Sequence, residues 1–350
     1  MICKKTDKEV VMKRAKKTEL FLAVLIVFVF SLVPLFLFAA GTKKAEENKV
    51  VLYTAHRETI VEAMLPKLKE ETGIEAEYVK MGSADVIRRV KAEKANPQCD
   101  VIWSIGAEQL EANPDLLEDY TPKDWDKIDP VFKVGNKWLP YTGIVMVFIV
   151  NTNLVPESEM PRTWLDLGDP KWKGKISSSR ADKSGSAYMQ LCTVLNIYKD
   201  RGWEVYKKIL SNFVLSGSSS AVPRYVNDGE AAIGITLEDN AWVYVQGGGP
   251  VKIVYPEDGT TAAPDGIALV KGAPHPSAAK TFIDWALSKS TQEFLVEKMG
   301  RRPVRVDVKA KGELPPLSEI KTVPYDFAWA AGNKDEFVKK WTELVMELGL

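Results

Sequence analysis

Apolar and polar positions alternate in blocks through the first part of the chain. Apolar runs at residues 49–54, 74–80 and 99–104 are rich in strand-forming residues and predict three strands. Between them, residues 58–73 and 83–95 repeat apolar positions at helical spacing. Alternation of this length predicts a βαβαβ unit with parallel strands, so the fold class is α/β.

A longer apolar run, Thr142–Val155, predicts a strand that crosses from this α/β lobe to a second one. Strand-like and helix-like segments then alternate again between residues 173 and 246. Two more apolar runs lie within Pro250–Ala273, and we place the hinge at the first crossing strand and at Val251–Thr261. The chain from His275 onward has the pattern of helices that pack on the lobes. We therefore predict one lobe from residues 49–145 plus 262–300 and another from residues 146–261 plus 301–350.

The N-terminal segment has a different pattern. Basic residues between Met12 and Lys17 precede a long apolar run, Leu20–Ala40. A basic flank followed by an apolar run is typical of an export signal, and this run is also long enough to span a bilayer. We therefore predict a signal peptide or N-terminal membrane anchor at residues 1–41 and a charged linker at residues 42–48. Everything after it is expected to be periplasmic or extracytoplasmic.

Composition narrows the possible functions. The 47 basic and 47 acidic residues balance, but the first 40 residues are basic, so the rest of the chain is slightly acidic. A slightly acidic body argues against nucleic acid as a partner. With two histidines and no hydrolase or zinc motif, the sequence predicts no enzyme, no catalytic residues and no cofactor. Cys99 and Cys192 lack metal-ligand spacing and are expected to be buried.

Several segments together resemble a known family. They are Tyr53–Tyr78, Asn96–Ser104, Pro161–Ile176, Ser184–Gln190, Val222–Thr236 and Gly266–Ser288. Their number and order resemble the extracytoplasmic solute-binding proteins of ABC importers, in the group of ferric-iron, thiamine, hexose-phosphate and aminoethylphosphonate binders. The resemblance implies a two-lobe periplasmic-binding-protein-like fold of type II, with hinge strands and a ligand cleft that closes on the solute. It also implies permease subunits in the membrane as partners, and we expect a monomer.

Three turns rich in Gly and Ser each open a predicted helix, at Met81–Asp85, Lys183–Tyr188 and Ser216–Tyr225. The first N–H groups of a helix lack intrahelical partners, and the helix dipole attracts anions there. Gly and Ser also serve as ordinary helix caps, so the signal depends on all three turns facing one cleft. In that case they predict a site for a small anionic solute, with a phosphorylated one as the leading class. The expected ligand-binding residues are His56, Arg57, Gly82, Ser83, Ser104, Ser184, Gly185, Ser186, Ser219, Ser220, Glu238 and Asp239.

The resemblance gives the two acidic residues two interpretations. In hexose-phosphate binders, an acidic residue at the position of Glu238 accepts sugar hydroxyls. In ferric-iron binders, a histidine at the position of His56 is joined by a carboxylate and two adjacent tyrosines, where this chain has Ile105, Asp239 and Asn240. The tyrosines are absent, but His56, Glu238 and Asp239 could still hold a metal. A ferric-iron or other metal-binding protein is therefore the alternative, followed by a membrane-anchored sensor or a secreted hydrolase.

Four other features have competing interpretations. His56 could cap the first helix instead of contacting a ligand. Trp103 could stack on a sugar or lie in the core. His275 is expected to be a surface cap, and the basic segment Arg301–Arg305 could contact either the cleft or a neighbouring lobe.

Overall fold

The computed structural model describes residues 48–133 and 137–350. The fold below is that of the compact unit formed by residues 50–350, with β1 beginning at Lys49. The predicted signal or anchor, and all of the predicted linker except its last residue, lie outside the described residues. Among the residues that are described, no helix is long and apolar enough to cross a membrane.

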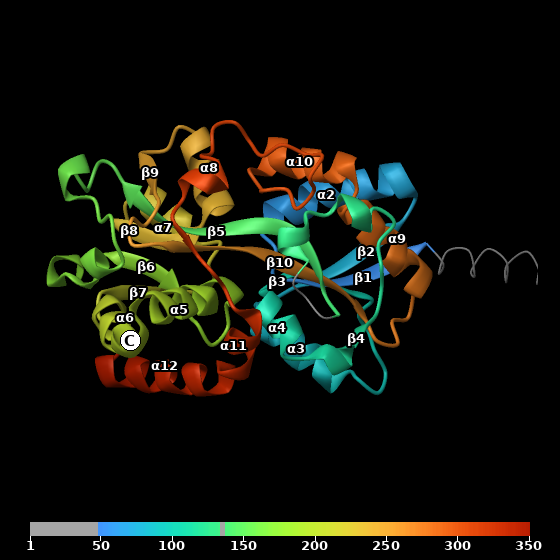
Figure 1. The fold of residues 1–350 in the computed structure, drawn as a ribbon, viewed down its shortest axis with the longest axis horizontal. Helices are drawn as coiled ribbons and strands as arrows, with labels where there is room; N and C mark the ends of the chain where they lie inside the picture. The colour runs from blue at the N-terminus through green and yellow to red at the C-terminus, as the bar shows by residue number, and fades with distance from the viewer. Residues whose placement is uncertain (1–47, 134–136) are drawn as a thin grey trace, which may run out of the picture. The chain divides into compact units, whose positions relative to one another are not determined.

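The first lobe begins with the predicted strand and helix alternation (Figure 1). In the sheet, β1 lies between β2 and β3, and β1 and β3 run parallel. Each connecting helix buries one apolar face, which explains its helical periodicity. These elements are β1 (Lys49–Thr54), α2 (Glu58–Thr72), β2 (Glu75–Lys80), α3 (Ser83–Ala92), β3 (Val101–Ile105), α4 (Ala107–Glu111) and β4 (Leu117–Glu118).

Two long strands join the lobes. β5 (Leu139–Asn151) is buried along its whole length, and it pairs antiparallel with β10 (Thr260–Val270). Toward the first lobe β10 pairs with β3, and toward the second lobe β5 pairs with β8 (Ile233–Leu237). The return crossing is β10, which lies within the segment Pro250–Ala273, whereas β9 (Val251–Val254), where we place the hinge, pairs only with the far end of β5. Both segments are apolar and β-branched, so only their pairing tells them apart.

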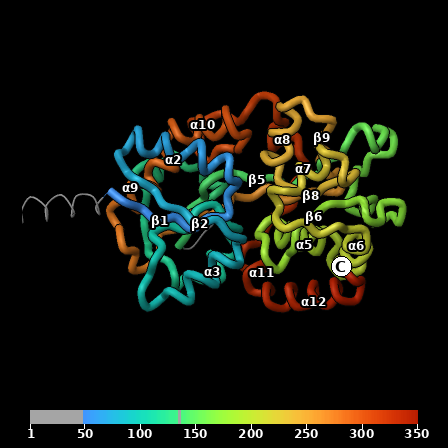
Figure 2. Tube along the Cα trace, turned by 180° about the vertical axis from the view of Figure 1, so that it is seen from behind, coloured from blue at the N-terminus to red at the C-terminus, as the bar shows by residue number. Residues whose placement is uncertain are grey.

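The second lobe continues the sheet in the order β5, β8, β6, β7, and β6 runs parallel to both of its neighbours. In Figure 2 its helices lie on the opposite side of the crossing strands from β1 and β2. Besides β8 and β9, its elements are β6 (Ile176–Ser179), α5 (Gly185–Tyr198), α6 (Gly202–Leu210), β7 (Phe213–Ser216), α7 (Val222–Asn227) and α8 (Glu238–Gln246). A mixed α/β fold of two lobes is confirmed.

The C-terminal helices cover both lobes. Helices α9 (Pro276–Ala286) and α10 (Lys289–Met299) share a core cluster with α2 of the first lobe. Val304 lies in the same cluster. Helix α11 (Phe327–Gly332) contacts α4 of the first lobe, and α12 (Lys334–Leu348) lies along the second lobe (Figures 1 and 2).

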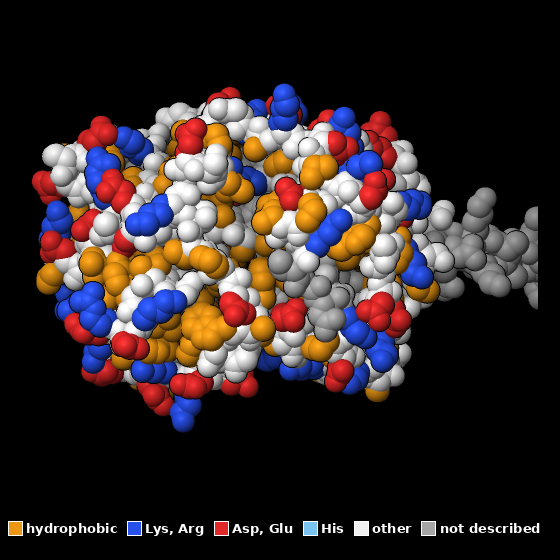
Figure 3. Space-filling view, viewed as in Figure 1, with side chains coloured by type: hydrophobic (Ala, Val, Ile, Leu, Met, Phe, Trp, Pro, Cys, Tyr) orange, Lys and Arg blue, Asp and Glu red, His pale blue; other side chains and the backbone are white. Residues whose placement is uncertain are grey.

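Smaller elements complete the described chain. Strand β11 (Thr322–Val323) pairs with the start of β10. Cys99 and Cys192 are both buried and free, as expected. Charged side chains of both signs are interspersed on the face seen in Figure 3, in keeping with the balanced composition. Single-turn 3-10 helices occur at Pro114–Leu116, Trp125–Lys127, Pro130–Phe132, Glu157–Glu159, Leu165–Gly168, Pro170–Trp172, Lys199–Arg201 and Leu317–Glu319.

Candidate functional site

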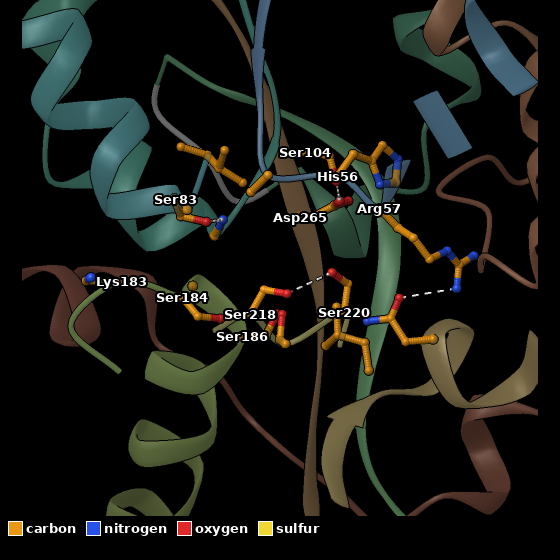
Figure 4. Close-up of a pocket in the computed structure, with 18 of the residues that line it drawn as sticks. His56, Arg57, Ser83, Ser104, Lys183, Ser184, Ser186, Ser218, Ser220 and Asp265 are labelled. Atoms are coloured by element: carbon orange, nitrogen blue, oxygen red, sulfur yellow. Dashed lines mark hydrogen bonds between the residues drawn. The ribbon is translucent and has the colours of Figure 1, made fainter. Parts of the chain in front are cut away.

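A cavity of about 350 Å³ lies between the two lobes, where strands of both lobes end (Figure 4). The first lobe contributes the turns after β1, β2 and β3. The second lobe contributes the turns before α5 and α7, and the crossing strand β10 contributes Asp265. This arrangement follows from the α/β topology, because the carboxyl ends of parallel strands meet at one edge of a sheet.

The wall from the first lobe is made by the start of α3 and the end of β3. Gly82 is the N-cap residue of α3 and offers no side chain to its first N–H groups. The Ser83 hydroxyl accepts a hydrogen bond from Gly106 N at 3.3 Å. Ser104 has φ 53°, a left-handed conformation that non-glycine residues rarely adopt. Its hydroxyl donates to the buried carboxylate of Asp265, which fixes the end of β3 against the crossing strand.

The wall from the second lobe is made by two serine-rich turns. Ser184 is the N-cap of α5, and its hydroxyl accepts a hydrogen bond from Ala187 N at 3.3 Å. Ser186 and Ser219 place their hydroxyls 3.3 Å apart, which links the α5 turn to the turn before α7. Beside them, the hydroxyls of Ser218 and Ser220 are 3.1 Å apart. The serine hydroxyls therefore gather on one side of the cavity, as Figure 4 shows.

The two walls touch at one edge of the cavity. Ala84 N donates a hydrogen bond to Lys183 O at 3.3 Å, across the gap between the lobes. A Cβ atom on Gly82 would lie 2.6 Å from that same carbonyl oxygen. A Cβ atom on Gly185 would lie 2.8 Å from the Ser83 hydroxyl and 3.0 Å from Gly106 N. Glycine at these two positions therefore allows the backbones of the two lobes to meet.

Positive charge exceeds negative charge around the cavity. Its lining includes four cationic side chains and two acidic ones, Asp85 and Asp265. Burial raises the pKa of Asp265, and the nearby Arg301 guanidinium opposes that shift. The four cationic side chains are those of Arg57, Lys80, Lys183 and Arg301.

Behind one end of the cavity lies a group that we call the arginine cluster, formed by Arg57, Arg301, Arg302, Glu238, Asp239 and Asp265. Arg302 donates two hydrogen bonds to Glu238, from Nε at 2.7 Å and from Nη2 at 2.8 Å. The Tyr255 hydroxyl donates to the same carboxylate at 2.6 Å. Arg57 Nη1 donates to Asp239 O at 3.0 Å and to the Asn240 side chain at 3.3 Å. These contacts connect the first lobe to the start of α8.

His56 belongs to the same neighbourhood. Its Nδ1 lies 3.2 Å from Arg301 Nη2, and its ring makes edge contacts with Trp103 and Tyr141. Burial lowers the pKa of His56 well below its usual value, and the charges of Arg301 and Arg57 lower it further. The imidazole is therefore neutral, and because Nδ1 accepts from Arg301, its proton is on Nε2. In Figure 4 the His56 ring lies beside Ser104 and on the opposite side of the cavity from Ser184, Ser186 and Ser218.

The structure brings most of the expected residues to one cavity. Those that line it are His56, Arg57, Gly82, Ser83, Ser104, Ser184, Gly185, Ser186, Ser219 and Ser220. Glu238 and Asp239 do not line it, because their carboxylates face the arginines behind its wall. Their expected contact with a ligand is therefore not supported by their positions.

Sequence reasoning missed several lining residues. Arg301 was left undecided between the cleft and a neighbouring lobe, and Asp265 within β10 carried no signal of its own. Trp103 is fully buried and packs against Phe282, so its place is in the core. The helix-cap interpretation of His56 is wrong, because the N-cap of α2 is Arg57. His275 is the N-cap residue of α9, as expected, but its ring makes no cap hydrogen bond and lies 2.9 Å from the Asp100 carboxylate.

The described residues contain no group of three or more His, Cys, Asp or Glu side chains arranged to hold a metal ion. The set His56, Glu238 and Asp239 in particular is not assembled. The Glu238 carboxylate is held by Arg302 and Tyr255, whereas His56 and Asp239 both face Arg301.

Two α/β lobes joined by crossing strands, with a polar cavity between them, define a solute-binding protein of the two-lobe type. The chain belongs to the family of bacterial extracellular solute-binding proteins, whose family model matches residues 97–330. This is a family of binding proteins, not of enzymes.

Similar proteins come from several bacteria. A putative 2-aminoethylphosphonate-binding periplasmic protein of Salmonella typhimurium is 29% identical over 69% of this chain and 73% of its own. An Fe(3+)-binding periplasmic protein of Serratia marcescens is 23% identical over 89% of this chain and 94% of its own. Among solved structures, the periplasmic binding protein AfuA from Actinobacillus pleuropneumoniae, with exogenous fructose-6-phosphate bound, has a TM-score of 0.80 and 26% identity. That match covers 85% of this chain and 98% of AfuA.

Proposed function

We propose that this protein is the extracytoplasmic component of an ABC importer that captures a small phosphorylated solute by closure of its lobes and delivers it to the membrane permease. The observation that carries the proposal is the convergence of three donor-rich turns, one from the first lobe and two from the second, on one cavity. A ligand held in this way would contact both lobes at once.

The chemistry of the cavity favours a phosphate or phosphonate group. The starts of α3 and α5 both face it, and a helix N-terminus presents N–H groups and a positive dipole end to an anion. The serine hydroxyls at positions 186, 218, 219 and 220 add donors that turn freely toward a ligand oxygen. Lys80 and Lys183 contribute positive charge beside these donors.

The size of the cavity favours a small solute. Its volume of about 350 Å³ is near the lower end of the range for ligand pockets, which runs from roughly 300 to 1,000 Å³. The names of two similar proteins point to a phosphonate and a sugar phosphate, which are small molecules that each carry such a group. Both facts support a phosphorylated or phosphonate solute of a few carbon atoms.

Closure would work by differential affinity. A ligand shifts the protein toward the closed form only as far as it binds that form better than the open one. The Ala84 to Lys183 hydrogen bond and the arginine cluster already connect the lobes in this structure. A bound anion would add contacts from Ser83 on one lobe and Ser186 on the other, and the closed form would then dock on the permease.

A ferric ion is the second candidate cargo. It is supported by the similarity to the Serratia Fe(3+)-binding protein and by the position of His56 in the cavity lining. We also propose export to the periplasm or the extracytoplasmic space, by a cleaved signal or a retained anchor. We expect a monomer without nucleic-acid partners.

A ligand screen on the exported protein tests the proposal. The melting temperature is measured with fructose-6-phosphate, 2-aminoethylphosphonate, inorganic phosphate and ferric citrate, and with fructose and citrate as matched controls. A ligand at 100 times its Kd stabilises the fold by about 2.7 kcal/mol, so its melting temperature must rise. We expect phosphorylated or phosphonate compounds to raise it and fructose to have no effect. A rise with ferric citrate alone would favour the ferric candidate instead.

A further inference from the structure

The guanidinium of Arg301 lies among three groups of the kind that bind metal ions. Nη2 is 3.2 Å from His56 Nδ1. Nε is 3.1 Å from Asp239 Oδ2, and Nη1 is 3.6 Å from Asp265 Oδ2. One histidine nitrogen and two carboxylate oxygens thus face three different nitrogens of one arginine, and such ligands suit zinc, iron and similar ions.

This group is buried. The exposed fractions are 4% for Arg301, 1% for His56, 4% for Asp239 and 4% for Asp265. Charges at such depth are tolerated only when they are paired. The Asp265 carboxylate also accepts hydrogen bonds from Ser104 and Thr142, whereas Asp239 Oδ2 has only ion pairs, with Arg301 and with Arg57 Nη2 at 3.8 Å.

We propose that Arg301 is a specificity-determining residue whose guanidinium takes the place of a metal cation among His56, Asp239 and Asp265, and so excludes metal ions from the cleft. The proposal rests on the proposed function, because it assumes that the solute is an anion. It adds a reason why this site would accept an anion instead of a metal ion.

Two physical effects would produce the exclusion. The lone pair of His56 Nδ1 already accepts from Arg301, so a metal ion would have to displace the guanidinium to reach it. A metal ion would also add positive charge beside Arg301 and Arg57 at a buried site, where repulsion between like charges is strong. Removing the Arg301 guanidinium abolishes the first effect and weakens the second, since Arg57 then remains as a cation beside Asp239.

The test measures metal binding by the wild-type protein and by Arg301→Met. Co²⁺ is titrated and followed by its absorption spectrum and by the melting temperature, and ferric citrate is titrated in parallel. We expect no saturation of the wild type below millimolar Co²⁺ and saturation of Arg301→Met in the micromolar range, a difference in Kd on the order of 1,000-fold. The gain should disappear in the double variant Arg301→Met, His56→Asn.

Two further variants serve as controls. Arg301→Lys keeps the positive charge and should not gain affinity for Co²⁺. Arg305→Met removes another buried arginine that pairs with two carboxylates, Asp124 and Asp307, but has no histidine partner, so it should not gain affinity either. If Arg301→Met does not fold, Arg301→Gln replaces it, because its amide is neutral and still able to donate hydrogen bonds.

Three outcomes would overturn the inference. They are tight Co²⁺ or ferric binding by the wild type that depends on His56, a folded Arg301→Met or Arg301→Gln that gains no affinity, and an equal gain in Arg305→Met. Failure of the proposed function would look different. In that case the wild type would bind no phosphorylated compound, whatever the Arg301 variants do with metal ions.

Discussion

The serine-lined side of the cavity and the arginine cluster behind its other end contrast in how far their polar groups are already paired. On the serine side, the donors are hydroxyls and helix N-termini whose protein contacts are few and long. In the arginine cluster, most charged groups already have a partner of opposite charge, with distances down to 2.7 Å between Arg302 and Glu238. The comparison teaches that charged residues beside a cleft can serve to join its lobes, while weaker donors remain available for a ligand.

The contrast also explains why residue type alone misleads. Glu238 and Asp239 are strong hydrogen-bond acceptors, and by type they suit sugar hydroxyls or metal ions. Their neighbours in space, Arg302 and Arg301, already use that capacity. The hydroxyls of Ser184 and Ser186 are weaker hydrogen-bonding groups than these carboxylates, but they lie at the start of a 14-residue helix whose N-terminus lines the cavity.

The largest expected effect is on stability, from Arg302→Met in the arginine cluster. Removing this side chain leaves the Glu238 carboxylate buried with Tyr255 as its remaining donor. Breaking a buried ion pair from one side costs about 3–5 kcal/mol of unfolding free energy. Urea unfolding measures the loss. Arg224→Met is the control, because that arginine pairs with Asp228 and Glu230 on the surface and should cost at most about 1 kcal/mol. Equal losses of unfolding free energy in the two variants would contradict a structural role for the arginine cluster.

The next effect is on ligand affinity, from Gly185→Val in the cavity wall. A Cβ atom here meets Ser83 and Gly106 of the other lobe at 3.0 Å or less, so the lobes cannot close fully. We expect an affinity loss of about 100-fold, or about 2.7 kcal/mol, for whichever compound the screen identifies. Isothermal titration calorimetry measures it. Gly332→Val is the control, since its Cβ would meet nothing within 4 Å. Unchanged affinity in Gly185→Val would show that ligand binding does not need this contact between the lobes.

A smaller effect separates the two roles of Ser184. Its hydroxyl caps α5, so Ser184→Ala should cost about 1 kcal/mol of stability. It should also weaken ligand binding, because the same helix start lines the cavity. Ser288→Ala removes an equivalent N-cap from α10, where the hydroxyl accepts from Thr291 N at 3.3 Å. That residue does not line the cavity. Both variants should lose similar stability, but only Ser184→Ala should lose affinity. A loss of affinity in both variants would mean that lower stability, and not a lost contact with the ligand, weakens binding.

Much of the fold could be predicted from the sequence because its signals are local. The strands and helices from Lys49 to Ile105 alternate, and the spacing of their apolar residues predicts them. Helix ends are also visible in the sequence, as at Gly73, which has a φ of 72° and ends α2. The turns at Gly82, Ser184 and Ser219 could also be predicted, since parallel strands bring such turns to one edge of a sheet.

The rest depends on contacts between residues far apart in the chain. Arg301 and His56 are separated by 245 positions, and no local pattern pairs them. The same holds for β9 and β10, because no local pattern shows which of them pairs with β3 of the first lobe. Which charges are neutralised, and which strand returns to the first lobe, are therefore properties of the tertiary structure.

A third buried acid, Glu108 of α4, sharpens the comparison because it lacks the pairing of Glu238. Its Oε1 accepts one hydrogen bond, from Gln109 at 3.3 Å, and it lies directly beneath Gly106 of the cavity wall. Burial raises the pKa of Glu108, and the positive charge of Lys334 opposes the shift only in part. The folded protein therefore holds this proton more tightly than the unfolded chain does.

The effect of Glu108→Gln depends on pH and is near zero in acid. The stability contributed by neutral Glu108 is fully present below its ordinary pKa of 4.5 and is lost as pH rises through the raised folded pKa. Glutamine stays neutral, so the variant should match the wild type in acid and become the more stable of the two as pH rises. Because one proton is involved, the difference grows by no more than about 1.4 kcal/mol per pH unit. Urea midpoints from acid to neutral pH measure it, with the exposed Glu343→Gln as control. If Glu108→Gln instead loses stability at neutral pH, then Glu108 is ionised and paired, and it belongs with Glu238 among the acids whose charge supports the fold.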